Sequence, residues 1–320
     1  VRMLRNASRA PSGHNTQPWT VRIISESEWC IGWDKSRALP AVDPENRELL
    51  LSIGTFCEGI KIAAKNEGLE SRIEVTGRTN FSSDLVKIRF SESERSCGMI
   101  DALQKRRTIK NGHQPRAIEN GDLKYITSGL GSGIYSFNKG SREASLIEAA
   151  VLESNKIQAW RDDAQGELGE WIRWSDSDVQ KYRNGLSPAG MEITGFGGWY
   201  VKHFFSREDV MSSSFRDQTV GIIQKFLSSY GSWIIITSTK DDCQSLIHAG
   251  GDFLKLSLNS VNKKIAIHPM TQPLEEKGFA DNIRRELGIK EKIQFILRAG
   301  YVEEYPLPVS ERMPVERIVI

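Results

Sequence analysis

Two long amphipathic helices with the same apolar spacing place the strongest constraint on how this chain can fold. Between about Glu48 and Asn66, apolar residues recur at intervals of three and four, the period of an α-helix. A later run repeats this spacing at a constant offset, so that Gly54 falls on Gly250. The matched positions are Leu50, Ile53, Cys57, Ile60 and Ala64 in the first run and Leu246, Ala249, Phe253, Leu256 and Ser260 in the second. Such weak internal symmetry is of the kind that a duplicated unit leaves.

Strand-like segments lie on both sides of each long helix. Runs rich in β-branched and aromatic residues predict strands over 20–24, 29–33, 71–76, 85–90, 134–137, 232–239 and 294–301. The first two are expected to pair as a hairpin. Other helices are predicted over 1–9, 98–105, 119–128 and 141–160, with a surface helix pair over 160–183. The chain therefore mixes helices and strands along its whole length.

The charge balance points away from nucleic acid and membranes as partners. Lys and Arg number 43 against 41 Asp and Glu, which leaves a net charge of +2, and hydrophobic residues make up 39% of the chain. This composition is that of an ordinary globular protein with one large or two small domains. No apolar run approaches the roughly 18 residues that a membrane helix needs. We therefore expect neither nucleic acid nor a membrane as a partner.

The cysteines and the first residue bear on where the protein works. Cys30, Cys57, Cys97 and Cys243 are scattered and form no C-x-x-C pair, so buried free thiols are expected rather than a zinc site or a redox dithiol. Free thiols suit a reducing compartment, and the cytoplasm is the expected location. The chain begins at Val1 with residues that read as the tail of a helix, so a missing upstream segment is expected and export stays open.

A rigid polar loop lies close to the N-terminus, at Ala10-Pro11-Ser12-Gly13-His14-Asn15-Thr16-Gln17-Pro18-Trp19. Its two prolines fix their own backbone and restrict the residues before them. Trp19 is large and apolar, and we expect it to anchor the loop in the core. The loop is either an ordinary helix-to-strand connection or, through Ser12, Asn15 and Gln17, part of a small-molecule site. Physical reasoning alone leaves both interpretations open.

Two further segments carry candidate ligand contacts. Lys105-Arg106-Arg107-Thr108-Ile109-Lys110 places four cations and a hydroxyl in six residues, a set that can hold a phosphate, although an isolated basic run is more often a solvated turn. The long loop over 185–200 carries Met191, Phe196, Trp199 and Tyr200. These side chains either cover a planar ligand or anchor the loop on the core.

The loop that begins at Ala10 gives the clearest link to a known family. Its pattern A-P-S-x-H-N-x-Q-P-W resembles the signature loop of the nitroreductase-like FMN flavoproteins, in their long single-chain branch of Acg-like proteins. The run that begins at Arg106 is similar to the family's basic phosphate-binding run. The segment Ser310-Glu311-Arg312-Met313-Pro314 resembles the family's C-terminal ending, and 268–274 looks like a further loop of this branch. Together these segments span nearly the whole chain.

The resemblance implies an α+β, nitroreductase-like fold with a central, mostly antiparallel β-sheet flanked by helices. Ordinary members of the family are dimers with FMN at the subunit interface, so two fused halves, 1–100 and 101–320, would imitate that dimer in one chain, a monomer. One FMN site would be complete and the other degraded, because no second Asn-x-Gln-Pro-Trp exists. Carried over by motif, Arg106, Thr108, Lys110 and Arg312 would bind the FMN phosphate, and Ser12, Asn15 and Gln17 would contact the ring edge or ribityl chain.

The function implied by the resemblance is flavin redox chemistry. The flavin carries such chemistry itself, so no side-chain nucleophile is expected. The leading hypothesis is an FMN oxidoreductase that passes electrons from NAD(P)H to a nitroaromatic, a quinone or a similar small acceptor. The alternative is an FMN-sequestering or storage protein with little turnover, in which a lid formed by 195–200 covers the flavin. A hydrolase or a metalloenzyme is disfavoured, because no G-x-S-x-G motif is present and the five histidines share no ligand spacing.

Overall fold

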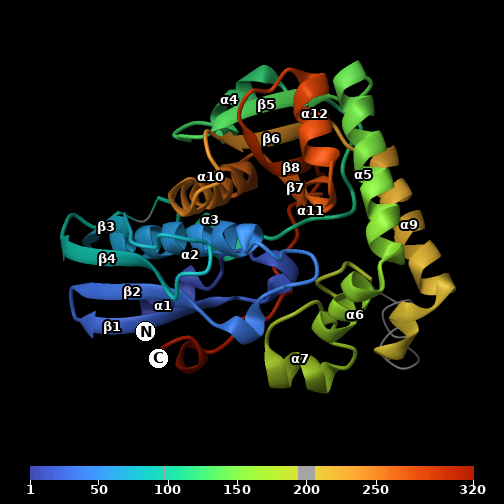
Figure 1. Cartoon of the computed structure of the whole chain (residues 1–320). Coiled ribbons are helices and arrows are strands. Elements are labelled where there is room, and N and C mark those ends of the chain that lie inside the picture. The colour runs from blue at the N-terminus through green and yellow to red at the C-terminus, as the bar shows by residue number, and fades with distance from the viewer. Residues whose placement is uncertain (97, 194–205) are drawn as a thin grey trace.

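The strands of this protein form two separate four-stranded sheets (Figure 1). The computed structural model describes residues 1–96, 98–193 and 206–320. The first sheet contains β1 (Trp19–Ser25), β2 (Glu28–Trp33), β3 (Leu69–Val75) and β4 (Asp84–Glu92). The second contains β5 (Gly133–Asn138), β6 (Ser232–Ser238), β7 (Ile265–Pro269) and β8 (Lys292–Tyr301). All neighbouring strands are antiparallel, and β1 and β2 form the predicted hairpin.

The two sheets have the same topology. Their strand orders are β1-β2-β4-β3 and β5-β6-β8-β7, so the strands of one sheet match those of the other in order of appearance. A long helix follows the second strand in each case: α2 (Arg47–Asn66) leads to β3, and α10 (Cys243–Asn262) leads to β7. The α+β class predicted from the sequence is confirmed, with its strands divided between two sheets.

Helices α2 and α10 lie side by side between the sheets, and their backbones meet at two glycines (Figure 1). A Cβ atom built on Gly54 would lie 2.1 Å from the carbonyl oxygen of Ile247, and one built on Gly250 would lie 2.0 Å from that of Leu51. Leu51 and Ile247 stand at the same sequence offset as the two glycines, so the two contacts are related by the internal symmetry. Only glycine allows so close an approach.

The first long helix begins where a carboxylate replaces its missing backbone partners. Asn46 is the N-cap, with a left-handed backbone, and the carboxylate of Asp43 accepts a hydrogen bond from the Leu49 amide at 2.8 Å. One face of α2 then packs beneath the N-terminal loop. There the Trp19 ring stacks on Phe56 with centroids 4.6 Å apart, and both side chains are fully buried. The prediction that Trp19 anchors the loop is confirmed.

Smaller helices surround this central pair. They are α1 (Arg2–Ala7), α3 (Ile100–Lys105), α4 (Asn120–Ile126), α5 (Arg142–Trp160), α6 (Asp162–Trp171), α7 (Asp176–Tyr182), α9 (Ser213–Ser228), α11 (Gln272–Glu275) and α12 (Phe279–Leu287). A second apolar core fills the space between α5, α9 and the second sheet, around Tyr230 and Trp233. The predicted surface pair corresponds to α6 and α7. The patterns described above do not predict α9 or α12.

The C-terminal tail returns to the first sheet. The Val21 amide of β1 donates a hydrogen bond to the Ile318 carbonyl at 2.7 Å, and the Ile320 amide donates to the Val21 carbonyl at 3.0 Å. Figure 1 shows both termini close to β1. Because the tail leaves the second sheet at β8 and ends against the first, residues near 312 are brought beside the N-terminal loop.

Three predictions from the sequence concern the cysteines, a membrane partner and the long loop over 185–200. Cys30, Cys57 and Cys243 are buried free thiols, as expected, whereas Cys97 lies outside the described residues. Within the described part of the chain, no helix is both long and apolar enough to cross a membrane. The predicted loop is irregular over 185–193. The proposed cover residues Phe196, Trp199 and Tyr200, with the whole 195–200 segment, lie outside the described residues.

Candidate functional site

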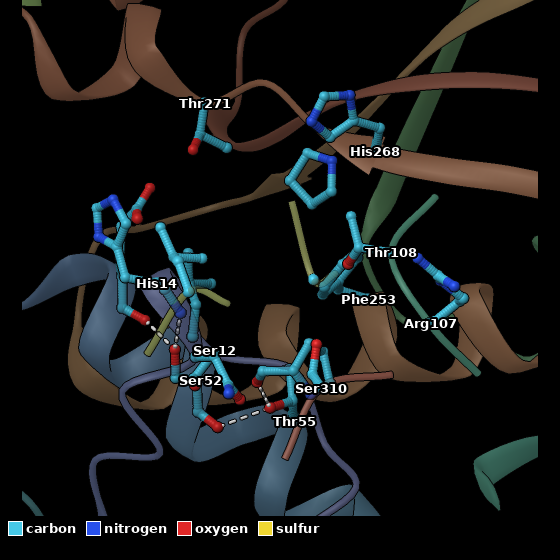
Figure 2. A pocket seen from close by; sticks show the side chains of 18 of the residues that line it. Ser12, His14, Ser52, Thr55, Arg107, Thr108, Phe253, His268, Thr271 and Ser310 are labelled. Atoms are coloured by element: carbon cyan, nitrogen blue, oxygen red, sulfur yellow. Dashed lines mark hydrogen bonds between the residues drawn. The ribbon is translucent and has the colours of Figure 1, made fainter. Parts of the chain in front are cut away.

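A cavity of about 350 Å³ lies where the N-terminal loop, α2, the basic run and the C-terminal tail meet (Figure 2). This volume is within the range of small-molecule sites. Ser12, Ser52 and Thr55 line the side built by the loop and α2, and His268 and Thr271 lie across from them in Figure 2. The cavity is therefore lined by segments that precede residue 100 and by segments that follow it.

The N-terminal loop has a strained backbone that α2 supports. His14, Asn15 and Gln17 all have positive φ angles, between 45° and 54°. Thr55 of α2 donates its hydroxyl to the carbonyl oxygen of Pro11 at 2.7 Å, and the Ser12 hydroxyl accepts the Gln17 amide at 2.9 Å. Backbone strain of this kind persists only where surrounding contacts enforce it, and it clusters at functional sites.

Asn15 joins this loop to two distant segments. Its Nδ2 donates to the carbonyl oxygens of Gly185 at 3.1 Å and Glu311 at 3.3 Å. Its Oδ1 accepts a hydrogen bond from Nη1 of Arg312 at 3.0 Å. The Asn15 amide is thus fully engaged, and it holds the Arg312 guanidinium in place at the cavity.

Gln17 differs from the other predicted ligands because it does not line the cavity. It is fully buried, its Nε2 donates to the Arg183 carbonyl at 2.9 Å, and its Oε1 accepts the Met313 amide at 2.8 Å. Both ends of its amide are occupied by backbone groups. The contacts that it makes in the structure fix the C-terminal tail beside the loop.

Three cations of the predicted site lie at the cavity without an acidic partner. Arg106 is only 6% exposed, and its Nη2 donates a long hydrogen bond to the Arg9 carbonyl oxygen at 3.5 Å. Lys110 Nζ donates to the Gly190 carbonyl at 2.8 Å. Among the described residues, no carboxylate lies within ion-pair distance of Arg106, Lys110 or Arg312. The Nε atoms of Arg106 and Arg312 are also buried without a hydrogen-bond partner in the described structure.

Their pKa values reflect this uncompensated charge. Burial lowers the pKa of Arg106, and burial together with the neighbouring guanidinium of Arg106 lowers the pKa of Arg312 to about 9. Burial lowers the pKa of Lys110 to about 8, although the carboxylate of Glu192 opposes this shift. Buried cations are costly unless they are paired with an anion. This end of the cavity is therefore suited to bind an anionic group.

The other members of the basic run have different surroundings. Arg107 pairs with the Glu192 carboxylate at 3.0 Å, and that carboxylate also accepts the backbone amides of Lys110 and Asn111. Thr108 lines the cavity and is labelled in Figure 2. Arg106, Arg107 and Lys110 therefore all line the cavity, but only Arg107 is paired with a carboxylate of the described residues.

A second group of cavity residues is acidic or neutral, and none of them is among the predicted site residues. Glu48 comes from α2, Glu275 from α11 and Gln158 from α5, while His14 belongs to the N-terminal loop. Burial lowers the pKa of His14, so its ring is neutral at pH 7. Among the described residues, no group of three or more His, Cys, Asp or Glu is placed to hold a metal ion.

Comparison with known proteins identifies the family. No family model matches the chain. A Mycobacterium tuberculosis H37Rv protein named "Putative NAD(P)H nitroreductase acg" is 36% identical over 335 residues, which cover 98% of this chain and 92% of that protein. This chain belongs to the nitroreductase family. A second protein of that strain, Rv3131, bears the same description and is 23% identical over 99% of this chain and 90% of its own length.

Two solved structures that align with part of this chain carry nitroreductase names. The FMN-dependent nitroreductase NfnB from Mycobacterium smegmatis, in complex with NADPH, aligns with 68% of this chain at 13% identity and a TM-score of 0.42. A nitroreductase with bound FMN from Bacteroides fragilis aligns with 70% at 13% identity and a TM-score of 0.40.

In this member of the nitroreductase family, six of the seven predicted site residues line one cavity. Ser12, Asn15, Arg106, Thr108, Lys110 and Arg312 meet there although they come from three distant segments. Gln17 stands apart from them. Sequence motifs found the cationic end of the cavity, because its residues cluster in short runs. They missed Glu48 and Glu275, which lie on separate helices and belong to no motif.

Proposed function

We propose that this protein is an FMN-dependent oxidoreductase that passes electrons from NAD(P)H to a small acceptor, such as a nitroaromatic or a quinone. Membership of the nitroreductase family supports the reaction class. The single observation that carries the proposal is that the predicted cations Arg106, Lys110 and Arg312 line the cavity and, among the described residues, have no carboxylate within ion-pair distance. A phosphate dianion would supply the negative charge that these cations lack.

The donors at this end fit the FMN phosphate. The buried Nε atoms of Arg106 and Arg312 lack partners among the described residues, so a ligand oxygen is needed to satisfy them. The Thr108 hydroxyl adds a neutral donor to the charged ones. Arg106, Thr108, Lys110 and Arg312 would hold the phosphate, and Ser12 and Asn15 would lie along the ribityl chain or ring edge. FMN would supply the redox chemistry when bound.

The residues of the chain would act by binding and orientation. Asn15 holds Arg312 at 3.0 Å, so the guanidinium is positioned before the cofactor arrives. The strained loop, which α2 supports, presents its polar groups without further ordering, and this lowers the entropic cost of binding.

The fused-dimer arrangement supplies the two sides of the site. We infer that residues 1–100 form one half, which supplies the Asn15 loop, and that 101–320 form the other, which supplies the basic run and the tail. The matched topology of the two sheets and the paired contacts at Gly54 and Gly250 support this division. One chain then holds both sides of the interface, so we propose a monomer with a single FMN site.

The absorption spectrum of the purified protein tests the proposal first. We expect a yellow protein, or a colourless one that takes up FMN, and bleaching of the flavin band on anaerobic mixing with NADPH or NADH. A protein that refuses FMN would contradict the flavin site. FMN binding without bleaching would contradict the oxidoreductase and favour the storage protein.

A further inference from the structure

Glu48 and Glu275 line one wall of the same cavity, and their carboxyl groups have different partners. The Glu275 carboxyl accepts hydrogen bonds from Nε2 of Gln158 at 2.6 Å and from the Thr271 hydroxyl at 3.0 Å. In the described part of the chain it has no cation within ion-pair distance. Glu48 is paired with Arg47 at 3.0 Å. Glu275 is therefore held in a defined orientation at the cavity by neutral donors alone.

The charges around Glu275 favour its protonated form. Withdrawal from solvent and the carboxylate of Glu48 hold its pKa well above the ordinary value, while the donors Gln158 and Thr271 and the cation Arg47 oppose this only in part. The adjacent Glu276 is neutralised by Arg161 at 3.1 Å. Two carboxyl groups that share a desolvated wall cannot both ionise at low cost. This wall of the cavity therefore favours the protonated form of the Glu275 carboxyl group.

A histidine in the same cavity also indicates that this region meets a ligand. His268 at the end of β7 is 7% exposed and lines the cavity, and its buried Nδ1 has no hydrogen-bond partner within the described residues. Its ring is fixed edge-on to Phe226, with centroids 5.2 Å apart. A buried polar atom without a partner is destabilising, and a bound molecule would supply the missing hydrogen bond.

We propose that Glu275 is the general acid that protonates the electron acceptor. The inference rests on the proposed function, in which NAD(P)H reduces the flavin. A quinone becomes a hydroquinone when it gains one hydride from the reduced flavin and one proton. The Glu275 O–H bond breaks, its electron pair stays on the carboxylate, and the proton forms the O–H bond of the acceptor oxygen. Water later returns a proton to Glu275, so the cycle balances.

Two acceptors separate proton donation from electron transfer. A quinone needs a proton, whereas ferricyanide takes one electron and no proton. General acids contribute about 100-fold or more to rate. We therefore expect Glu275→Gln to lower the rate at which 1,4-benzoquinone reoxidises the reduced flavin by about 100-fold. Reoxidation by ferricyanide and reduction by NADPH should stay within about threefold of the wild type. Equal losses with both acceptors, or no loss with quinone, would overturn the proposal.

A neighbouring carboxylate provides a matched control. Glu276 lies next to Glu275 on the chain, but it is paired with Arg161 and does not line the cavity. Glu276→Gln should therefore leave quinone reoxidation unchanged, and a loss as large as that of Glu275→Gln would assign the effect to packing.

The pH profile of a Glu48 variant tests the influence of the neighbouring charge. Glu48→Gln removes the like charge and lowers the pKa of Glu275. The fall in quinone reoxidation with rising pH should then begin at a lower pH than in the wild type, and an unmoved profile would contradict the role of Glu275.

Infrared spectroscopy of the flavin-free protein tests the acid without turnover. The difference spectrum between wild type and Glu275→Gln at neutral pH should contain the C=O stretch of a protonated carboxyl group. Its absence would overturn the proposal even if the enzyme is active. Failure of the flavin to bleach with NAD(P)H would instead contradict the proposed function, and would leave the infrared result as the separate test of Glu275.

Discussion

Arg312 donates a hydrogen bond from Nη1 to Oδ1 of Asn15 at 3.0 Å, across 297 positions of sequence. The contact joins the C-terminal tail to the N-terminal loop at the cavity wall. Nδ2 of Asn15 donates to the Gly185 and Glu311 carbonyl oxygens, so the amide has one orientation that satisfies all three partners. A residue that looks like a cofactor ligand in the sequence thus also positions a second ligand.

Replacement of Asn15 should weaken FMN binding without unfolding the protein. Loss of one hydrogen bond to a charged group removes about 1.5–3 kcal/mol, so Asn15→Ala should raise the Kd for FMN about tenfold or more. Alanine also strains the backbone, because φ at this position is 54°. Asn15→Gly removes the amide but tolerates that conformation. Fluorescence titration with FMN gives the affinity and thermal unfolding gives the stability. If the glycine variant binds FMN with wild-type affinity, the loop has only a structural role.

Arg106 should contribute more to FMN affinity than its neighbour in the basic run. Arg106 is buried at the cavity, whereas Lys105 is exposed. Arg106→Gln removes a charge-assisted contact to the phosphate, and we expect its Kd for FMN to rise about 100-fold. Lys105→Gln should change the Kd less than about threefold, since exposed charges act weakly through solvent. Isothermal titration calorimetry of the flavin-free variants compares their Kd values for FMN. Similar losses of affinity would mean that the basic run attracts FMN through its overall positive charge and not through a specific contact of Arg106.

FMN affinity should pass through a maximum in pH. In the flavin-free protein the pKa of Lys110 is lowered to about 8, so its charge is lost as pH rises through that value. The phosphate gains its second charge only above about pH 6. Affinity should therefore fall below about pH 6 and again above about pH 8, by up to about tenfold per pH unit. Titrations across this range check the profile. Lys110→Met should lose the alkaline fall near pH 8, and retention of that fall would assign it to another group.

The contact between the long helices should tolerate no side chain at Gly54. A Cβ atom there would lie 2.1 Å from the Ile247 carbonyl oxygen, which is backbone and cannot move away alone. Gly54→Ala should cost about 3 kcal/mol or more of unfolding free energy. Gly221 in α9 has nothing within 4 Å of its Cβ position, so Gly221→Ala should stabilise the protein by about 0.5–1 kcal/mol. Denaturant unfolding measures both, and a mild effect at Gly54 would mean that the helices can separate.

The sequence by itself determined the local elements and the cationic end of the site. Periods of three and four predict α2 and α10, and strand patterns predict β1 and β2, because the signals that form these elements lie within about 20 residues. The basic run and the loop at Ala10 are short motifs, so Arg106 and Asn15 could be named before their neighbours were known.

Tertiary structure decided what these residues meet. Gln17 belongs to the same sequence motif as Asn15, yet its side-chain amide forms hydrogen bonds with backbone groups of Arg183 and Met313. Glu275 and Glu48 share one wall only because α11 and α2 converge there. These placements depend on contacts between segments that lie hundreds of residues apart in the sequence, and burial then shifts the pKa values of the side chains. No local sequence pattern predicts these contacts, because their energy comes from residues that are far apart along the chain.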